Sequence, residues 1–202
     1  MKKLFVIAAA MLAAISAGAQ NYVNLGYGLP TSITRYSNEK SNGIDGNAFT
    51  LGYSHNFDFT DFMGLEMGVN GVYEFFNTKD DLDKTLLETR SNYLGATAPV
   101  LLNFKLDMDS VAFKFLAGAT CSYGFVDKMA TFVDGVKGFE INNYDDLDAR
   151  RFGVSASAAL AAEWADVFRF KIGFDYGLTD LNKNSNIKNT VNMLSFSVGY
   201  LF

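Results

Sequence analysis

Residues 167–178 alternate strictly between two kinds of side chain. The odd positions from Arg169 onward carry charged residues or glycine. Successive side chains of a β-strand point to opposite faces, so a period of two predicts a strand with one apolar and one polar face. The apolar face consists of Phe168, Phe170, Ile172, Phe174, Tyr176 and Leu178.

The same alternation recurs in seven other parts of the chain. These segments cover residues 23–29, 49–57, 63–75, 94–106, 111–125, 152–164 and 194–202. With 167–178 they make eight expected strands. Each is near or above the roughly 9–11 residues with which a tilted strand crosses a bilayer.

The connections between these segments alternate in length. Short turns are expected at 59–62, 107–110 and 165–166, and long polar loops at 34–46, 77–90, 127–149 and 179–190. Bacterial barrels place short turns in the periplasm and long loops outside the cell. The sequence therefore predicts an all-β fold, an eight-stranded antiparallel up-and-down transmembrane β-barrel, with both chain ends on the short-turn side.

The first nineteen residues have the pattern of a cleaved signal peptide. Lys2 and Lys3 precede an apolar run, 4–15, and Ala17-Gly18-Ala19 offers a small-x-small cleavage site. The alternative, a retained anchor helix, needs a longer apolar run. We therefore expect a signal peptide at 1–19 and a barrel domain at 20–202.

Charge and composition exclude several classes of function. Loss of Lys2 and Lys3 takes the formal net charge from −5 to −7, which argues against a nucleic-acid partner. Cys121 is the sole cysteine, so no internal disulfide is expected. No cofactor and no metal or catalytic residues are predicted.

The size of the apolar side chains indicates which face points outward. A soluble carrier barrel turns its apolar face inward, whereas a membrane barrel turns it toward lipid. An eight-stranded interior is only wide enough to be filled by its own side chains. The many aromatic residues therefore belong outside, in two belts near the strand ends. In the belt near the short turns we expect Phe57, Phe104, Phe113, Trp164, Phe168, Tyr200 and Phe202. In the belt near the long loops we expect Tyr73, Phe75, Tyr123, Phe125, Phe152 and Tyr176.

The opposite face carries charged residues of both signs. Buried charges must be paired, because an unpaired one costs several kcal/mol. Equal numbers predict an internal ion-pair network that fills the lumen. Its expected members are Asp58, Glu66, Glu74, Glu163 and Asp175 with Lys105, Lys114, Arg151, Arg169 and Lys171.

Two short motifs resemble known outer-membrane proteins. Phe196-x-Val198-x-Tyr200-x-Phe202 resembles the insertion signal that the barrel-assembly machinery reads. Residues 92–104, with Asn92-Tyr93-Leu94 and Pro99-Val100-Leu101-Leu102, resemble a strand of the PorT-like outer-membrane β-barrel family, with a longer spacer before the proline. In architecture the chain resembles the OmpA/OmpX type. The resemblance implies an integral outer-membrane location. Pro99 lies mid-strand, where a bulge or a missing inter-strand bond is expected.

Three functions remain open at this stage. The first is a non-catalytic, monomeric barrel in contact with outer-membrane lipids, with a structural or surface-interaction role through its extracellular loops and an unidentified ligand. The loop at 127–149 is the most acidic, and Asp145-Asp146-x-Asp148 lacks the spacing of a calcium loop. The alternatives are a lipid-modifying enzyme, for which the sole histidine, His55, has no matching serine and acid, and a narrow solute pore.

Overall fold

The computed structural model describes residues 20–36, 43–82, 85–183 and 187–202. The expected signal peptide at 1–19 lies outside them. Nine strands and one short helix are described, and among these residues no helix is long and apolar enough to cross a membrane. They are β1 Gln20–Tyr36, β2 Gly43–Thr60, β3 Met63–Leu82, β4 Thr85–Met108, β5 Val111–Val133, β6 Val136–Asn142, α2 Asn143–Asp146, β7 Phe152–Trp164, β8 Phe168–Gly177 and β9 Ile187–Leu201.

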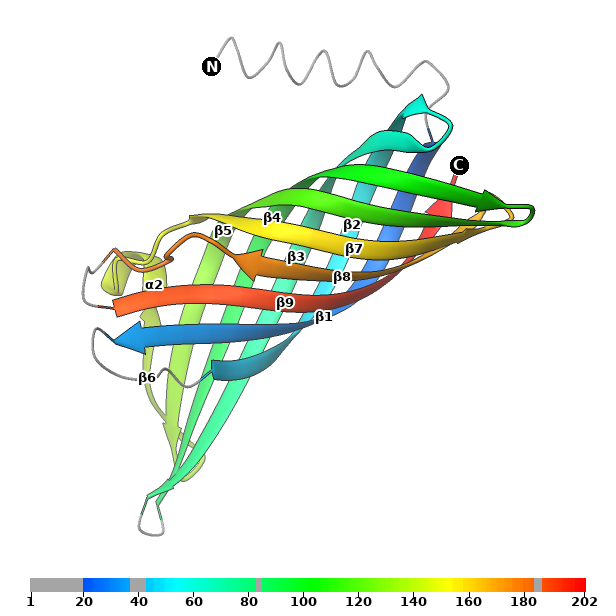
Figure 1. Ribbon diagram of the computed structural model, residues 1–202. Helices are drawn as coiled ribbons and strands as arrows, with labels where there is room; N and C mark the ends of the chain where they lie inside the picture. Colours follow the sequence, from blue (N-terminus) through cyan, green and yellow to red (C-terminus); the bar gives the residue numbers. More distant parts are fainter. Residues whose placement is uncertain (1–19, 37–42, 83–84, 184–186) are drawn as a thin grey trace.

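Eight of the strands close into an antiparallel ring (Figure 1). Each strand pairs with its neighbours in chain order, and β1 pairs with β9, which joins the first strand to the last. The remaining strand, β6, is outside the ring and pairs only with the far end of β5. The expected eight-stranded up-and-down ring is therefore confirmed, whereas β6 was not predicted.

The short turns fall where the sequence predicted them. They lie at residues 61–62, 109–110 and 165–167. The two ends of the described chain lie at the same end of the ring, since Asn21 and Phe202 exchange backbone hydrogen bonds. The last turn is tight: Ala165 and Asp166 both have positive φ, and the Val167 amide donates to the Trp164 carbonyl over 3.1 Å.

The structure corrects two of the long loops expected from the sequence. Most of 77–90 and the first part of 127–149 are strand, because β3 and β4 pair out to Leu82 and Thr85, and β5 continues to Val133. Beyond the ring, polar side chains such as Lys79 and Asp80 occur on both faces of these strands. The chain there has no reason to alternate, which is why periodicity did not reveal them. In Figure 1, β3, β4 and β5 run beyond the other strands as a sheet extension.

The two faces of the ring differ as predicted. Large apolar side chains are exposed on the outside, among them Leu25 and Leu160, each 65% exposed. The inside holds buried side chains that include Arg169, Glu66 and Leu116. The side chains of the two expected aromatic belts are exposed on the outside of the ring, except Phe57 and Phe75, which are half exposed.

Pro99 interrupts one ladder without shifting it. Between β3 and β4 the pairs Met67–Val100 and Asn70–Thr97 belong to one register, and no pairs form between them. Proline has no amide proton to donate, so the ladder loses bonds on this side. The expectation of a missing inter-strand bond at Pro99 is confirmed.

Candidate functional site

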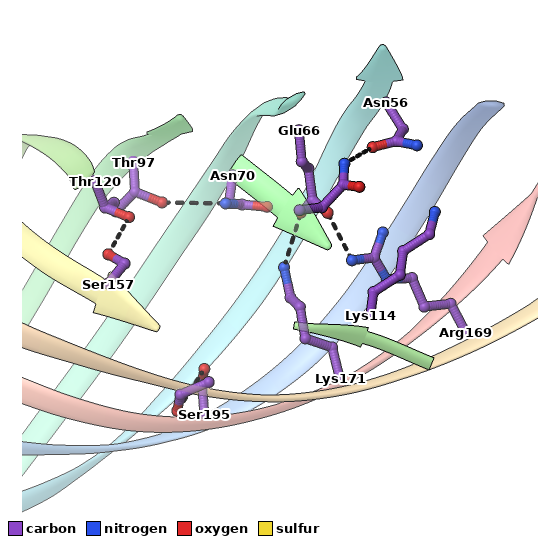
Figure 2. Close-up of polar contacts among 12 residues, drawn as sticks. Asn56, Glu66, Asn70, Thr97, Lys114, Thr120, Ser157, Arg169, Lys171 and Ser195 are labelled. Atoms are coloured by element: carbon purple, nitrogen blue, oxygen red, sulfur yellow. Dashed lines mark hydrogen bonds and ion pairs between the residues drawn. The ribbon is translucent and has the colours of Figure 1, made fainter. Parts of the chain in front are cut away.

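The short-turn half of the lumen is closed by a cluster of buried charges, which we call the ion cluster (Figure 2). Its centre is Arg169 of β8, whose Nη2 atom lies 2.6 Å from Glu66 Oε2 and whose Nη1 atom lies 3.5 Å from Glu163 Oε1. Lys171 Nζ lies 3.4 Å from the other oxygen of Glu66, and Lys114 Nζ lies 2.9 Å from Glu163 Oε1. Four strands of the ring, β3, β5, β7 and β8, therefore meet across the lumen.

Register explains how the cluster forms. Glu163 and Arg169 are Cα partners on β7 and β8, so their side chains lie next to each other on the inner face. Glu66 reaches Arg169 from β3, on the opposite side of the ring. Burial leaves these charges little water, and each is compensated by an oppositely charged neighbour. The Arg169 guanidinium also lies 4.4 Å from the ring centre of Tyr22.

Neutral side chains complete this closure. Asn103 donates to Asn56, and Asn56 donates to Asp58 over 2.7 Å. An apolar cluster of Leu101, Leu116, Ala159 and Ala161 packs on the inner face. The prediction of a side-chain-filled lumen is thus confirmed for the short-turn half of the ring.

The other half of the lumen is open, which corrects the prediction of filling along its whole length. A cavity of about 490 Å³, here called the vestibule, opens between the ring and the long connections. Ser and Thr residues line its wall together with a comparable number of apolar residues such as Val154, Leu181 and Met193. The small Ser and Thr side chains leave space that longer ones would fill. The Ser and Thr residues of the wall are Ser32, Thr34, Thr78, Thr89, Ser91, Thr97, Thr120, Ser122, Ser155 and Thr179.

The expected ten-residue network is only partly formed. Glu74 and Asp175 line the vestibule, and neither makes an ion pair with a described residue. Asp175 accepts a hydrogen bond from Ser157. Lys105 pairs with Asp107 at 3.0 Å, outside the expected set. Equal counts of acids and bases therefore did not imply mutual pairing, because the ring separates the groups by height.

Arg151 also departs from the expected network. Its Nη1 atom donates to the Phe125 carbonyl over 3.1 Å, and its guanidinium lies 4.2 Å from the ring centre of Tyr144. Its carboxylate neighbour is Asp145, at 3.7 Å. Arg151 therefore holds α2 against the wall of the vestibule.

The short helix α2 brings further polar groups to the vestibule. Asn142 caps it by accepting from the Tyr144 amide over 3.2 Å, and Asn143 Nδ2 donates to Asp127 over 2.7 Å. The side chain of Tyr144 is only 8% exposed. Burial, followed by the carboxylate of Asp127, raises the pKa of the Tyr144 hydroxyl above its ordinary value. The hydroxyl therefore stays protonated at neutral pH.

The acidic residues near α2 do not converge. Asp145 accepts from Asn142 Nδ2, Asp146 accepts from the Asn142 amide, and Asp148 pairs with Lys183 at 3.3 Å. Among the described residues no group of three or more His, Cys, Asp or Glu side chains is placed to hold a metal ion. Each carboxylate has its own local partner.

His55 is the one histidine, and its surroundings differ from expectation. It was expected on the lipid-facing surface, but it is only 6% exposed, because Phe57 covers its ring at 4.2 Å between ring centres. Its Nδ1 atom lies 2.7 Å from Asn21 Oδ1. The chain Thr120, Ser157 and Asp175 contains a serine and an acid, but His55 is not part of it.

Three tyrosines of the lumen were missed. Tyr22 and Tyr93 lie on the inner face of their strands. Extending the alternation would have found both, since Tyr22 shares its parity with Asn24 and Tyr93 shares its parity with Thr97. Tyr144 lies in α2, a segment without a periodic pattern in the sequence.

No family model matches the chain, and no curated protein matches it. Among solved structures it is similar to outer-membrane β-barrel proteins. The attachment invasion locus protein Ail of Yersinia pestis is 16% identical, with 91% of this chain and 99% of that chain covered and a TM-score of 0.47. Neisserial surface protein A is 16% identical over 92% and 99%, with a TM-score of 0.43. The outer membrane enzyme PagL is 12% identical over 87% and 98%, with a TM-score of 0.38.

These identities and scores are low. The fold of the chain is defined by its closed eight-strand ring with two unlike faces.

Proposed function

We propose that the chain is an integral outer-membrane barrel without catalytic activity, closed at its periplasmic end and active at its surface. One observation carries this proposal: apolar side chains cover the outside of a ring whose inside holds ion pairs. Water-soluble monomers rarely expose large continuous apolar patches. In a bilayer the same surface is satisfied by lipid, and the closed ring leaves no unpaired strand edge within the membrane.

The ion cluster supports a closed lumen. A solute pore would need a continuous path through the ring, and in the short-turn half that path holds Arg169, Lys114 and Glu66, each almost fully buried. The vestibule ends above these side chains. We therefore favour a surface role over transport.

The sheet extension offers a surface for interaction. Next to this extension, β6 pairs with β5 along one edge, and no described strand pairs with its other edge. Val136 and Phe139 of β6 are exposed, at 71% and 54%. A free strand edge beside apolar side chains can pair with an extended segment of another polypeptide.

The finer assignments rest on resemblance. Membership of the PorT-like or OmpA/OmpX-like barrels is part of the proposal, as is monomeric assembly. So is recognition of Phe196, Val198, Tyr200 and Phe202 by the barrel-assembly machinery. In β9 the side chains of Phe196, Val198 and Tyr200 lie in a single outward row.

Cell fractionation tests the location. We expect the protein in outer membranes, and we expect unboiled and boiled samples to migrate differently on gels because a barrel resists unfolding by detergent. Recovery as a soluble periplasmic monomer without detergent would contradict the proposal.

Epitope tags test the orientation. A tag inserted at Gly135, where a Cβ would meet nothing within 4 Å, should bind antibody on intact cells. A matched tag at the short turn of Asp109 should bind only after the cells are permeabilised. Labelling of the Asp109 tag on intact cells would show that the short turns face outward.

A further inference from the structure

Two carboxylates lie near each other at one level of the vestibule wall. Glu74 of β3 is the Cα partner of Tyr93 on β4, and Tyr93 is the partner of Asp127 on β5. All three side chains line the cavity. The register therefore places Glu74 and Asp127 on either side of Tyr93, on β3 and β5.

Several oxygen acceptors in this part of the wall have no donor. Glu74 makes no hydrogen bond or ion pair with any residue that the structure describes. Asp127 receives one hydrogen bond, from Asn143 Nδ2. The amide oxygen of Asn143 is buried and has no partner in the described chain. Such a surplus of acceptors is complementary to a ligand that donates several hydrogen bonds and carries positive charge.

Two aromatic rings flank the carboxylates. Tyr144 is more than nine-tenths buried and lines the cavity, and no hydrogen bond of its hydroxyl is formed within the described residues. Tyr93 lies between the two carboxylates in the register, and the rings of Tyr93 and Tyr144 both lie against Gly124. Tyrosine faces attract cations, and phenolic hydroxyls accept hydrogen bonds from them.

The basic residues nearby do not neutralise the pair. Arg151 is held by Phe125, Tyr144 and Asp145, and Lys171 is held by Glu66. Arg150, the other arginine of the wall, has an exposed side chain. Among the described residues neither Glu74 nor Asp127 forms an ion pair, so their oxygens can accept hydrogen bonds from a ligand.

We propose that the vestibule binds a small hydrophilic primary amine. Its ammonium group lies between Glu74 and Asp127 against the two tyrosines, and the rest of the molecule contacts the Ser and Thr residues of the wall. The cavity, at about 490 Å³, is in the range of small-molecule sites. This binding site goes beyond the proposed surface role and does not depend on it.

Ligand titration of the purified protein in detergent tests the chemistry of the site. The probes are glucosamine and glucose, which differ by the amino group, followed by saturation-transfer NMR. We expect glucosamine to bind at least tenfold more tightly than glucose at pH 7. Equal binding of the two sugars, no binding of glucosamine, or its displacement by calcium chloride at matched ionic strength would overturn the proposal.

Variants locate the site. Glu74→Gln and Asp127→Asn keep the side-chain size, and each should weaken glucosamine binding at least tenfold. The control, Asp107→Asn, removes a carboxylate at the short-turn end and should leave binding unchanged. Gel migration without boiling shows whether each variant is folded. One folded variant, Glu74→Gln or Asp127→Asn, is enough for the test. Unchanged affinity in a folded Glu74→Gln or Asp127→Asn protein would refute the site.

Discussion

Arg169 makes two ion pairs and a ring contact in a place that water hardly reaches. Replacing it by leucine leaves Glu66 with Lys171 alone and removes one of two partners from Glu163. Removing one member of a buried ion pair costs about 3–5 kcal/mol. We expect Arg169→Leu to lower the free energy of unfolding by about that amount, measured by urea unfolding in detergent.

Leu178→Ala is the matched comparison, because Leu178 is a 59% exposed side chain just beyond the end of β8. In detergent this truncation should cost about 1 kcal/mol or less, since little packing is lost. If Leu178→Ala destabilises the barrel more than Arg169→Leu, the charges of the lumen are not coupled as their distances indicate.

The alternation of odd and even positions predicted on which face of the sheet most residues lie, but not which residues form ion pairs. Glu66, Glu74 and Glu163 were all expected inside, and all three are. Only Glu66 and Glu163 meet cations, because their strands bring them to the level of Arg169. The height of a residue in a barrel depends on strand tilt and register, which a single sequence does not contain.

At the scale of single elements, the turn between β7 and β8 carries local strain. Ala165 has φ of 52°, a left-handed conformation that costs a residue with a Cβ about 1–2 kcal/mol. Asparagine tolerates this conformation better than alanine. We expect Ala165→Asn to raise the free energy of unfolding by about 0.5–1 kcal/mol, because the turn keeps its hydrogen bond and loses strain.

Gly135 provides the converse test. It has φ of 80° in the turn between β5 and β6, and an added Cβ would meet open space. Gly135→Ala should therefore act only through the backbone and destabilise its hairpin by about 1 kcal/mol. Hydrogen exchange of the β6 amides measures the change. Faster exchange is expected, and unchanged exchange would mean that the turn conformation is not strained.

The elements themselves were largely predictable within the ring and poorly predictable beyond it. The alternation of β7 and β8 is imposed by the difference between the two faces of the ring, so the sequence contains it. In the outer parts of β3, β4 and β5, polar residues occur on both faces, and loop and strand look alike. The capped turn of α2 depends on Asn142 and its contacts with the wall, which are tertiary.

At the scale of the whole molecule, the closed half of the lumen predicts electrical behaviour. With the ion cluster across the ring, the purified protein should show little or no stable conductance in planar lipid bilayers. A large and steady open channel would contradict the closed lumen. The vestibule alone cannot conduct ions, because it ends at the side of the ion cluster that faces the long connections.

The central proposal for the whole molecule is that the outer face of the ring contacts lipid. Leu160 lies on that face between Phe115 and Ile172, away from both strand ends of β7. An arginine facing the middle of a bilayer costs about 2–4 kcal/mol, whereas at a water-exposed position it changes stability by about 0.5 kcal/mol or less. The decisive measurement is the free energy of unfolding of Leu160→Arg in phospholipid vesicles. A loss of about 2–4 kcal/mol is predicted, and stability within about 0.5 kcal/mol of the parent protein would contradict a lipid-facing exterior.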